Sequence, residues 1–267
     1  MRNNVNAHDR YRRRRIIIGP AVQHCNPSET FPAVPMPARP REMPSPVTGV
    51  ALWCCGLERS PGDIAAVAAW LSPAESARAA RFGTEDLRRR WIAGRTTLRM
   101  LLAEVLGVQA PNVAIRRGVR GRPELADTGA GVDFNVSHTR GVALIGIARG
   151  LPFGTRIGVD IERADRDVGA DRLARKFLTA RERATLEDRT PDARRRLFLR
   201  YWTCKEAMSK ATGDGLAAPF RMLDVELSES PRLVDGPAPY VPERWSLQSV
   251  AVPEGLLATL AIWRGPE

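Results

Sequence analysis

Two carboxylates stand two residues apart in the stretch RIGVDIE, which has the composition of a short strand. Side chains of a strand alternate between its two faces, so Asp160 and Glu162 point the same way and lie about 7 Å apart. Because like charges repel, a site that keeps them together usually supplies a cation. Oxygen ligands favour Mg²⁺, which binds through one or two carboxylates together with substrate phosphates. The simpler alternative is an edge strand whose polar face meets solvent.

A third carboxylate lies in the stretch YWTCKEAMSKATGDGL, which has a helical pattern. At 100° per residue one apolar stripe contains Leu197, Tyr201, Cys204, Met208 and Ala211. Glu206 and Lys210 share the opposite face, where a solvated i,i+4 ion pair is the simplest interpretation. If this helix packs beside the strand, Glu206 instead joins Asp160 and Glu162 in a three-carboxylate site. Lys210, one turn beyond, then points at the same phosphates.

Other side chains along the sequence suit phosphate oxygens. Ser137 and His138 end a strand in FNVSHT, and both can donate hydrogen bonds to phosphate, although a plain turn residue is the alternative for His138. Guanidinium groups offer forked donors that match phosphate geometry. The arginines considered are Arg78, Arg81, Arg90, Arg95 and Arg122, most of which must be solvated surface.

The elements that would position these residues predict an α+β fold in two similar halves. Residues 1–48 are rich in Pro and Arg without apolar periodicity, and we expect a largely disordered tail. Ser72 and Pro73 start a helical pattern that runs to Gly107. The stretches VDFNVSH, GVALIGIA and RIGVDIE follow as an expected antiparallel meander.

The second half repeats this theme, and GVALIGIAR resembles GLLATLAIWR. We therefore expect two pseudo-twofold subdomains, 49–154 and 155–267, each a small antiparallel sheet packed with a long helix. A ligand would bind in the cleft between them.

Composition narrows the classes of protein. The chain has 267 residues, 43% of them hydrophobic, which is enough for a sizeable core. No apolar run approaches the roughly 20 residues of a membrane helix. The four cysteines have no metal-ligand spacing and fit a reducing compartment, so we expect a cytoplasmic protein that does not bind membranes. The net charge of +11 indicates an anionic partner without identifying it.

Four motifs, FNVSH, GVDIE, FLTARE and WTCKEAMSKATGDGL, occur in the order and at roughly the separations typical of the 4′-phosphopantetheinyl transferase superfamily. The chain resembles its larger, surfactin-synthetase-type members over about residues 50–230. This resemblance implies that coenzyme A, the substrate, and Mg²⁺ bind between two α+β subdomains. It also implies transfer of 4′-phosphopantetheine to a serine of an acyl or peptidyl carrier protein, with release of 3′,5′-ADP.

Residue by residue, the resemblance assigns the metal to Asp160, Glu162 and Glu206. The positions that it implies for binding coenzyme A are Arg81, Arg95, Arg122, Ser137, His138, Asp160 and Lys210. Glu206 is the expected general base and Lys210 steadies the leaving group. Glu75 departs from the family, because some relatives have a lysine there for the 3′-phosphate.

Two other classes of function compete with this interpretation. The high pI and the runs YRRRR and DLRRR suit a nucleic-acid-binding protein, but nothing in that class explains three neighbouring carboxylates, and we expect no nucleic-acid partner. A catalytically inactive relative that binds only coenzyme A is the other alternative. The expected partner is an acidic carrier domain, and because one chain supplies both walls of the cleft, we expect a monomer.

Overall fold

The structure is a computed structural model that describes residues 40–118, 120–127, 129 and 131–265. Most of the expected tail lies outside these residues. Its last part does not fit the boundary at 48, because β1 (Arg41–Met43) pairs antiparallel with β2 (Val50–Gly56). Met43 is buried against the first sheet, and this burial explains why the short strand β1 stays paired with β2. No helix among the described residues is both long and apolar enough to span a bilayer.

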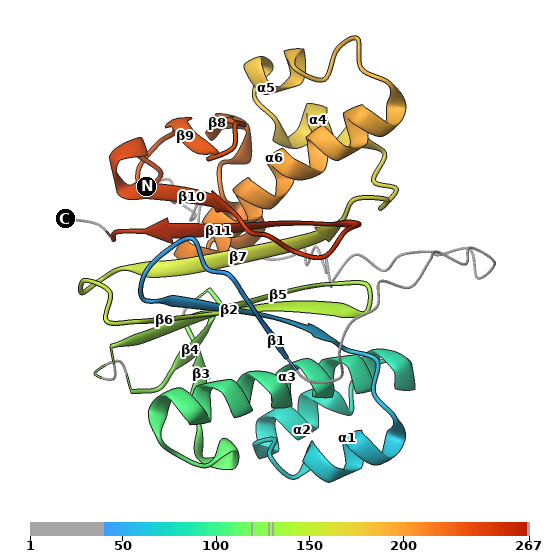
Figure 1. The fold of residues 1–267 in the computed structure, drawn as a ribbon, viewed down its shortest axis with the longest axis vertical. Helices are drawn as coiled ribbons and strands as arrows, with labels where there is room; N and C mark the ends of the chain where they lie inside the picture. Colours follow the sequence, from blue (N-terminus) through green and yellow to red (C-terminus); the bar gives the residue numbers. More distant parts are fainter. Residues whose placement is uncertain (1–39, 119, 128, 130, 266–267) are drawn as a thin grey trace, which may run out of the picture. The chain divides into compact units, whose positions relative to one another are not determined.

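The first half is a four-stranded antiparallel sheet with helices on one face (Figure 1). The strand order is β1-β2-β6-β5, with β5 at Val132–Thr139 and β6 at Val142–Arg149. The covering helices are α1 (Pro61–Ala68), α2 (Pro73–Ala79) and α3 (Glu85–Leu106). A small hairpin of β3 (Ile115–Arg117) and β4 (Pro123–Leu125) follows α3.

The helical pattern expected from Ser72 to Gly107 is two helices rather than one. Ser72 caps α2 with a capping box to Glu75, as its sequence indicates. The chain then turns through Gly83, and Thr84 caps α3 afresh by accepting from the amide of Leu87. Gly107 ends α3 in the left-handed conformation, at φ 68°, as the sequence predicts.

The second half is a three-stranded sheet in the order β10-β11-β7, again with a long helix on one face. Its strands are β7 (Arg156–Arg163), β10 (Trp245–Ser249) and β11 (Leu256–Trp263). Its helices are α4 (Ala170–Phe177), α5 (Ala180–Ala184) and the 22-residue α6 (Pro191–Thr212). A hairpin of β8 (Asp224–Glu226) and β9 (Arg232–Asp235) follows α6. The expected meander is wrong at its last strand, because β7 pairs with β11 rather than with β6.

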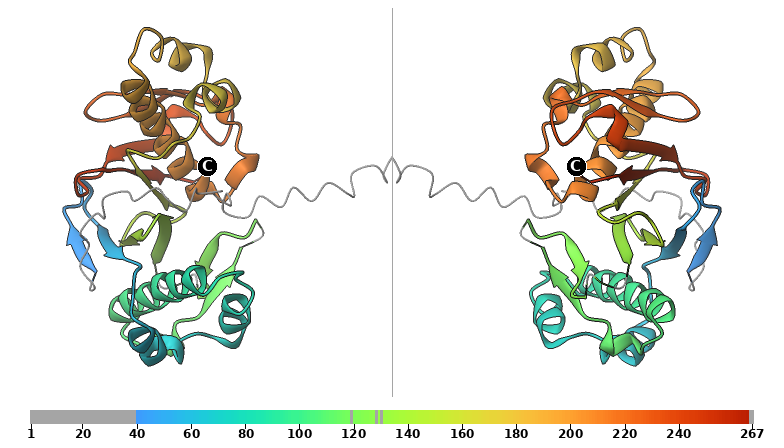
Figure 2. Two further views of the ribbon diagram at one scale, coloured as in Figure 1. Left: turned by 90° about the vertical axis from the view of Figure 1, so that its right-hand side faces the viewer. Right: turned by 90° about the vertical axis from the view of Figure 1, so that its left-hand side faces the viewer.

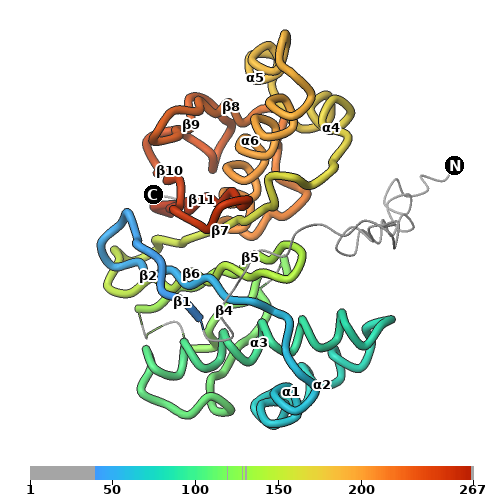
Figure 3. The backbone as a smooth tube through the Cα atoms, turned by 45° about the vertical axis from the view of Figure 1, so that its right-hand side comes forward, coloured from blue at the N-terminus to red at the C-terminus, as the bar shows by residue number. Residues whose placement is uncertain are grey.

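The two halves have the same topology. Each runs strand, long helix, small hairpin and two further strands, and in each sheet the last strand lies between the other two, giving β2-β6-β5 and β7-β11-β10. Both long helices contain 22 residues. Figures 2 and 3 show the two sheets facing each other between their helices. The predicted α+β fold of two similar subdomains is thereby confirmed.

Apolar side chains and one row of polar ones join the two sheets. Leu52 and Leu144 of the first sheet belong to the same buried cluster as Val159 and Leu260 of the second. Beside it, three amides of β7 donate to three side chains of β5: Ile157 to Asp133 at 2.8 Å, Val159 to Asn135 at 3.0 Å, and Ile161 to Ser137 at 3.3 Å. Side chains therefore replace a backbone ladder where the halves meet.

Candidate active site

Gly158 sets how closely strand β7 and helix α6 approach. A Cβ atom at this position would lie 1.9 Å from the carbonyl oxygen of Ala207 and 2.7 Å from the amide nitrogen of Ala211. Only a residue without a side chain fits against this helix backbone. Asp160 follows on the same face of β7, so the close approach brings it to Lys210, one turn from Glu206. The helix therefore packs beside the strand, as the three-carboxylate interpretation requires.

Asp160 is the most enclosed of the three carboxylates, with 4% of its surface exposed. Its Oδ1 accepts hydrogen bonds from the Lys210 ammonium at 2.6 Å and from the Ser137 hydroxyl at 2.8 Å. The Lys210 ammonium also donates to the Ser137 hydroxyl at 2.7 Å. Asp160 Oδ2 is buried without a hydrogen-bond partner among the described residues. One oxygen of the Asp160 carboxylate thus accepts hydrogen bonds from the protein, and the other accepts none from the described residues.

Glu162 is buried beside Asp160 and has two contacts from the chain. Thr139 donates to Oε2 at 3.3 Å, and the Arg166 guanidinium pairs with Oε1. Loss of solvation, followed by the charge of Asp160, raises the pKa of Glu162 to about 7, against the opposing pull of Arg166 and Lys210. The carboxylate therefore lacks enough positive charge around it to ionise as easily as in water.

Glu206 projects from α6 toward the same charges. Burial raises its pKa to about 7, with further contributions from Asp160 and Glu162, while Lys210 and Arg166 lower it. Its Oε1 is buried and has no hydrogen-bond partner in the part of the chain that is described. The charge of Asp160 thus raises the pKa of both glutamates. As the side chains stand, no group of three His, Cys, Asp or Glu residues within the described ranges is arranged to hold a metal.

Ser137 and His138, both predicted at phosphates, end β5 differently. The Ser137 side chain is buried, and its hydroxyl is occupied by Asp160, Lys210 and the Ile161 amide. His138 is exposed beside it. Partial loss of hydration first, and the Lys210 ammonium second, hold the pKa of His138 below its usual value. The ring is therefore mainly neutral near pH 7.

Arg122, predicted to contact coenzyme A, is buried with all three of its guanidinium nitrogens bonded within the protein. It pairs with both oxygens of Asp133, at 3.0 and 2.8 Å. It also donates to four backbone carbonyls, those of Pro123, Phe134, Ile157 and Lys210. Arg122 thus ties β5, β7 and the end of α6 together. A contact between its side chain and coenzyme A stays a prediction.

Of the remaining predicted arginines, Arg78 and Arg81 lie at the end of α2 and just after it, and Arg90 and Arg95 lie on α3, where Arg90 pairs with Glu58. Arg95 pairs with Glu75 at 2.8 Å and lies over the Trp91 ring, which Arg78 also approaches. Arg78 Nε is buried without a hydrogen-bond partner within the described residues, and burial lowers its pKa, followed by the charges of Arg117 and Arg81. Arg81 itself is exposed. These like charges indicate an anion-binding surface.

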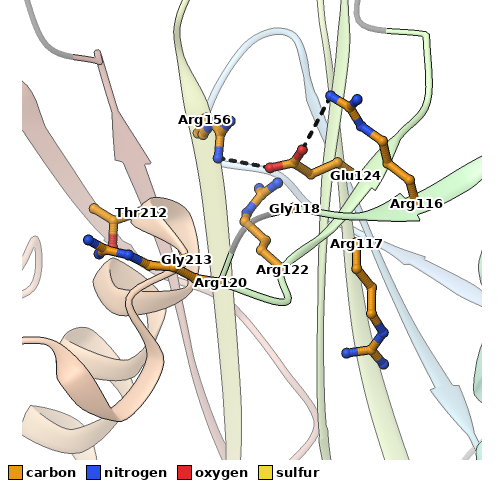
Figure 4. A pocket seen from close by; sticks show the side chains of 9 residues that line it. All are labelled: Arg116, Arg117, Gly118, Arg120, Arg122, Glu124, Arg156, Thr212 and Gly213. Atoms are coloured by element: carbon orange, nitrogen blue, oxygen red, sulfur yellow. Dashed lines mark ion pairs between the residues drawn. The ribbon is translucent and has the colours of Figure 1, made fainter. Parts of the chain in front are cut away.

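Between the two halves lies a pocket of about 390 Å³ (Figure 4). Arginines dominate its lining, and Glu124 pairs with Arg116 and Arg156 in its wall. The pocket is lined by Arg116, Arg117, Gly118, Arg120, Arg122, Glu124, Arg156, Thr212 and Gly213. Residues of β3, β4 and their turn thus face β7 and the end of α6 across it. The pocket has the charge and position to take an anionic ligand at the seam.

Sequence reasoning missed a buried ion pair that fixes α6. The Lys205 ammonium, fully buried, donates to Glu182 Oε2 at 2.6 Å and to the carbonyls of Phe177 and Phe220 at 3.0 and 2.7 Å. Glu182 also accepts the amides of Thr179 and Val225. Glu182 lies in the motif FLTARE and Lys205 in the motif WTCKEA. The occurrence of both motifs in one chain was the feature of the sequence that could have predicted this ion pair.

Comparison with known proteins identifies the family. The profile of the 4′-phosphopantetheinyl transferase superfamily matches residues 156–256, and that of the 4′-phosphopantetheinyl transferase N-terminal region matches 58–148. The chain is 35% identical to the 4′-phosphopantetheinyl transferase HetI of Nostoc sp. over 219 residues, 80% of this chain and 87% of that protein. It is 26% identical to the 4′-phosphopantetheinyl transferase of Bacillus subtilis over 67% of this chain and 79% of that one.

Among solved structures, a holo-(acyl-carrier-protein) synthase from Bacillus anthracis in complex with CoA (3′,5′-ADP) is similar at 18% identity and a TM-score of 0.33. It covers 42% of this chain and 96% of its own length. The sequence matches extend over both halves and include both of the elements that carry the carboxylates. The chain belongs to the 4′-phosphopantetheinyl transferase superfamily.

Proposed function

We propose that this chain transfers 4′-phosphopantetheine from coenzyme A to a serine hydroxyl of a carrier protein, releasing 3′,5′-ADP, with Mg²⁺ as cofactor. One observation carries the assignment of the site. Asp160 and Glu206 each keep a buried oxygen without a partner among the described residues, beside the Lys210 ammonium. Unpaired buried carboxylate oxygens are costly unless a ligand contacts them, which supports the assignment of the metal and pyrophosphate to this site.

The donor set fits Mg²⁺. Asp160, Glu162 and Glu206 offer oxygen ligands in a partly desolvated cluster, and burial raises the pKa values of Glu162 and Glu206, so a bound cation would favour their ionised forms. These three residues would hold the ion together with the pyrophosphate of coenzyme A. When bound, Mg²⁺ neutralises the charge of the pyrophosphate and favours attack at phosphorus.

Glu206 is the proton acceptor in this proposal. Without a metal, burial raises its pKa to about 7, and bound Mg²⁺ would favour its ionised form, which is the form that can accept the proton. The serine oxygen forms a bond to the phosphorus that bears pantetheine, and its proton passes to Glu206. The bond from that phosphorus to the bridging oxygen breaks, and 3′,5′-ADP leaves with the electron pair.

Lys210 stabilises the leaving group. Its ammonium lies on Asp160 and Ser137, one helical turn from Glu206, so it reaches the same side of the site. Positive charge held in place before the reaction lowers the barrier, because no reorganisation is needed as negative charge develops on the leaving phosphate. Asp160 and Ser137 keep Lys210 in this position.

The nucleotide end of coenzyme A would occupy the arginine-lined pocket between the halves. Its 3′-phosphate requires a cation in place of the lysine that some relatives have at the position of Glu75. Arg78, with a buried Nε that has no described partner and with Arg81 and Arg117 nearby, is the residue best suited to it. His138, exposed at the end of β5, faces solvent where phosphate oxygens can reach it.

The acidic carrier, the monomeric state, the cytoplasmic location and the surfactin-synthetase type are parts of this proposal. The net charge of +11 supports an acidic partner, since opposite charges accelerate encounter. The encounter should therefore slow as salt is added.

Intact-protein mass spectrometry of an apo carrier incubated with the chain, coenzyme A and Mg²⁺ tests the proposal. A mass gain of one phosphopantetheine that EDTA abolishes is expected. Asp160→Asn and Glu206→Gln should each slow transfer by at least about 10²-fold. Glu85→Gln, which removes only an exposed ion pair with Arg88, is the matched control and should transfer normally. Coenzyme A binding without transfer to several carriers would favour an inactive relative.

A further inference from the structure

Arg166 contacts a carboxylate of the site but has no part in the mechanism above. It lies in the segment between β7 and α4, four residues after Glu162, and its guanidinium pairs with Glu162 Oε1. Thr139 of β5 donates to the other oxygen. The chain's own donors therefore occupy both oxygens of Glu162, unlike those of Asp160 and Glu206.

The positive charge of Arg166 lies beside the other carboxylates as well as on its own partner. Glu162 stands two residues from Asp160 on the same face of β7, and Asp160 pairs in turn with Lys210. Three carboxylates then face two cations of the chain, Lys210 and Arg166. Asp160 and Glu162 each have a cation of the chain as partner, and a divalent cation that binds them has to compete with these two groups.

Of the two cations, Arg166 is the one whose side chain can move away from its carboxylate partner. The Lys210 ammonium is held on both Asp160 and Ser137 and is carried by a long helix. The Arg166 side chain is 27% exposed, and the one ion pair that it forms within the described chain is with Glu162. A long side chain on a connecting segment can leave its partner without moving a helix or a strand.

We propose that Arg166 is an internal counter-ion that competes with Mg²⁺ for Glu162 and leaves it when the pyrophosphate of coenzyme A offers the guanidinium another acceptor. The inference rests on the proposed function, in which Glu162 is a metal ligand. Mg²⁺ alone should then bind weakly, and coenzyme A should strengthen its binding. This coupling would keep the site from filling with metal before the substrate arrives.

Isothermal titration of Mg²⁺ into the full chain, without and with coenzyme A, measures this competition. Arg166→Gln should bind Mg²⁺ alone about two- to fivefold more tightly, which is the range that a partly exposed ion pair contributes. The factor by which coenzyme A raises Mg²⁺ affinity should shrink correspondingly. Arg166→Lys retains the charge and should stay close to the unaltered chain. Arg88→Gln, which removes an exposed arginine of α3, is the control and should change neither affinity.

Unchanged or weakened binding of Mg²⁺ by Arg166→Gln would overturn the inference, as would a lysine variant that behaves like the glutamine one. Absence of Mg²⁺ binding by the unaltered chain, even with coenzyme A, would overturn both the metal assignment and the role of Arg166. If the expected affinities are found but no carrier is modified, the role of Arg166 stands and the transfer proposal fails. The titration and the mass assay together therefore distinguish a failure of the role proposed for Arg166 from a failure of the proposed transfer reaction.

Discussion

Replacing Gly158 with alanine tests whether the close approach of β7 and α6 positions the site. The new Cβ would lie 1.9 Å from the Ala207 carbonyl oxygen, whereas real Cβ contacts essentially never fall below 3.0 Å. The strand and helix must separate locally by about 1.1 Å to relieve this clash. Both partners are backbone atoms, so no flexible side chain can absorb the change. The carboxylate of Asp160 would then move away from Lys210 and Glu206.

Two effects of known size should follow. Overpacking at a close contact typically costs about 1–3 kcal/mol of unfolding free energy. A shift of about 1 Å in a reacting group can cost about 10²-fold in rate. We expect Gly158→Ala to unfold at lower denaturant concentration and to lose about 10²-fold in kcat/KM for carrier modification, measured by mass spectrometry.

Gly94→Ala is the matched control. Gly94 lies inside α3, where a Cβ would meet only Leu57 Cδ2 at 3.4 Å, an ordinary contact. Alanine in a helix interior gains about 0.5–1 kcal/mol over glycine, so this variant should be as stable as the unaltered chain or more so. If Gly158→Ala kept both its stability and its rate within about twofold, or lost stability while keeping its rate per folded molecule, the positioning role of Gly158 would be refuted.

Two further predictions concern buried and titrating groups. Lys205→Met leaves Glu182 buried without its cation and should cost about 3–5 kcal/mol in denaturant unfolding, while adding Glu182→Gln should recover part of the loss. Additive losses in the double variant would show that the pair is not coupled. The ring protons of His138 should titrate in NMR spectra with a pKa below 6.5, and Lys210→Met should raise that pKa because a neighbouring positive charge is removed. No change in this variant would place the two side chains farther apart than described.

Simple periodicities were enough to predict which of the candidate carboxylates share a face of their strand or helix. Alternation along β7 placed Asp160 and Glu162 together, and helical spacing placed Glu206 with Lys210 opposite the stripe that contains Cys204 and Met208. That stripe is confirmed, since both of these residues are at most 1% exposed. The topology of the halves was partly visible too, because the similar strands GVALIGIAR and GLLATLAIWR are the central strands β6 and β11.

What the sequence could not reveal depends on contacts between distant segments. The sequence shows only that Arg122 is a residue type that can bind phosphate. The fold shows that its guanidinium donates hydrogen bonds to Asp133 and to backbone carbonyls of both halves. In the sequence, Glu75 only marks the loss of the lysine that some relatives have at this position. In the structure it pairs with Arg95 and Arg99 inside the first half. Pairing partners of long polar side chains follow from three-dimensional packing, which periodicity does not encode.

The row of polar side chains on β5 also has a consequence for aggregation. β7 is hydrogen-bonded to β11 on one side only, so its other edge carries amides that would otherwise invite a foreign strand. Asp133, Asn135 and Ser137 cover alternate amides of that edge. Strand addition there would require breaking all three bonds as well as parting the apolar cluster between the sheets. The seam that positions the site therefore also protects the chain from edge-to-edge association.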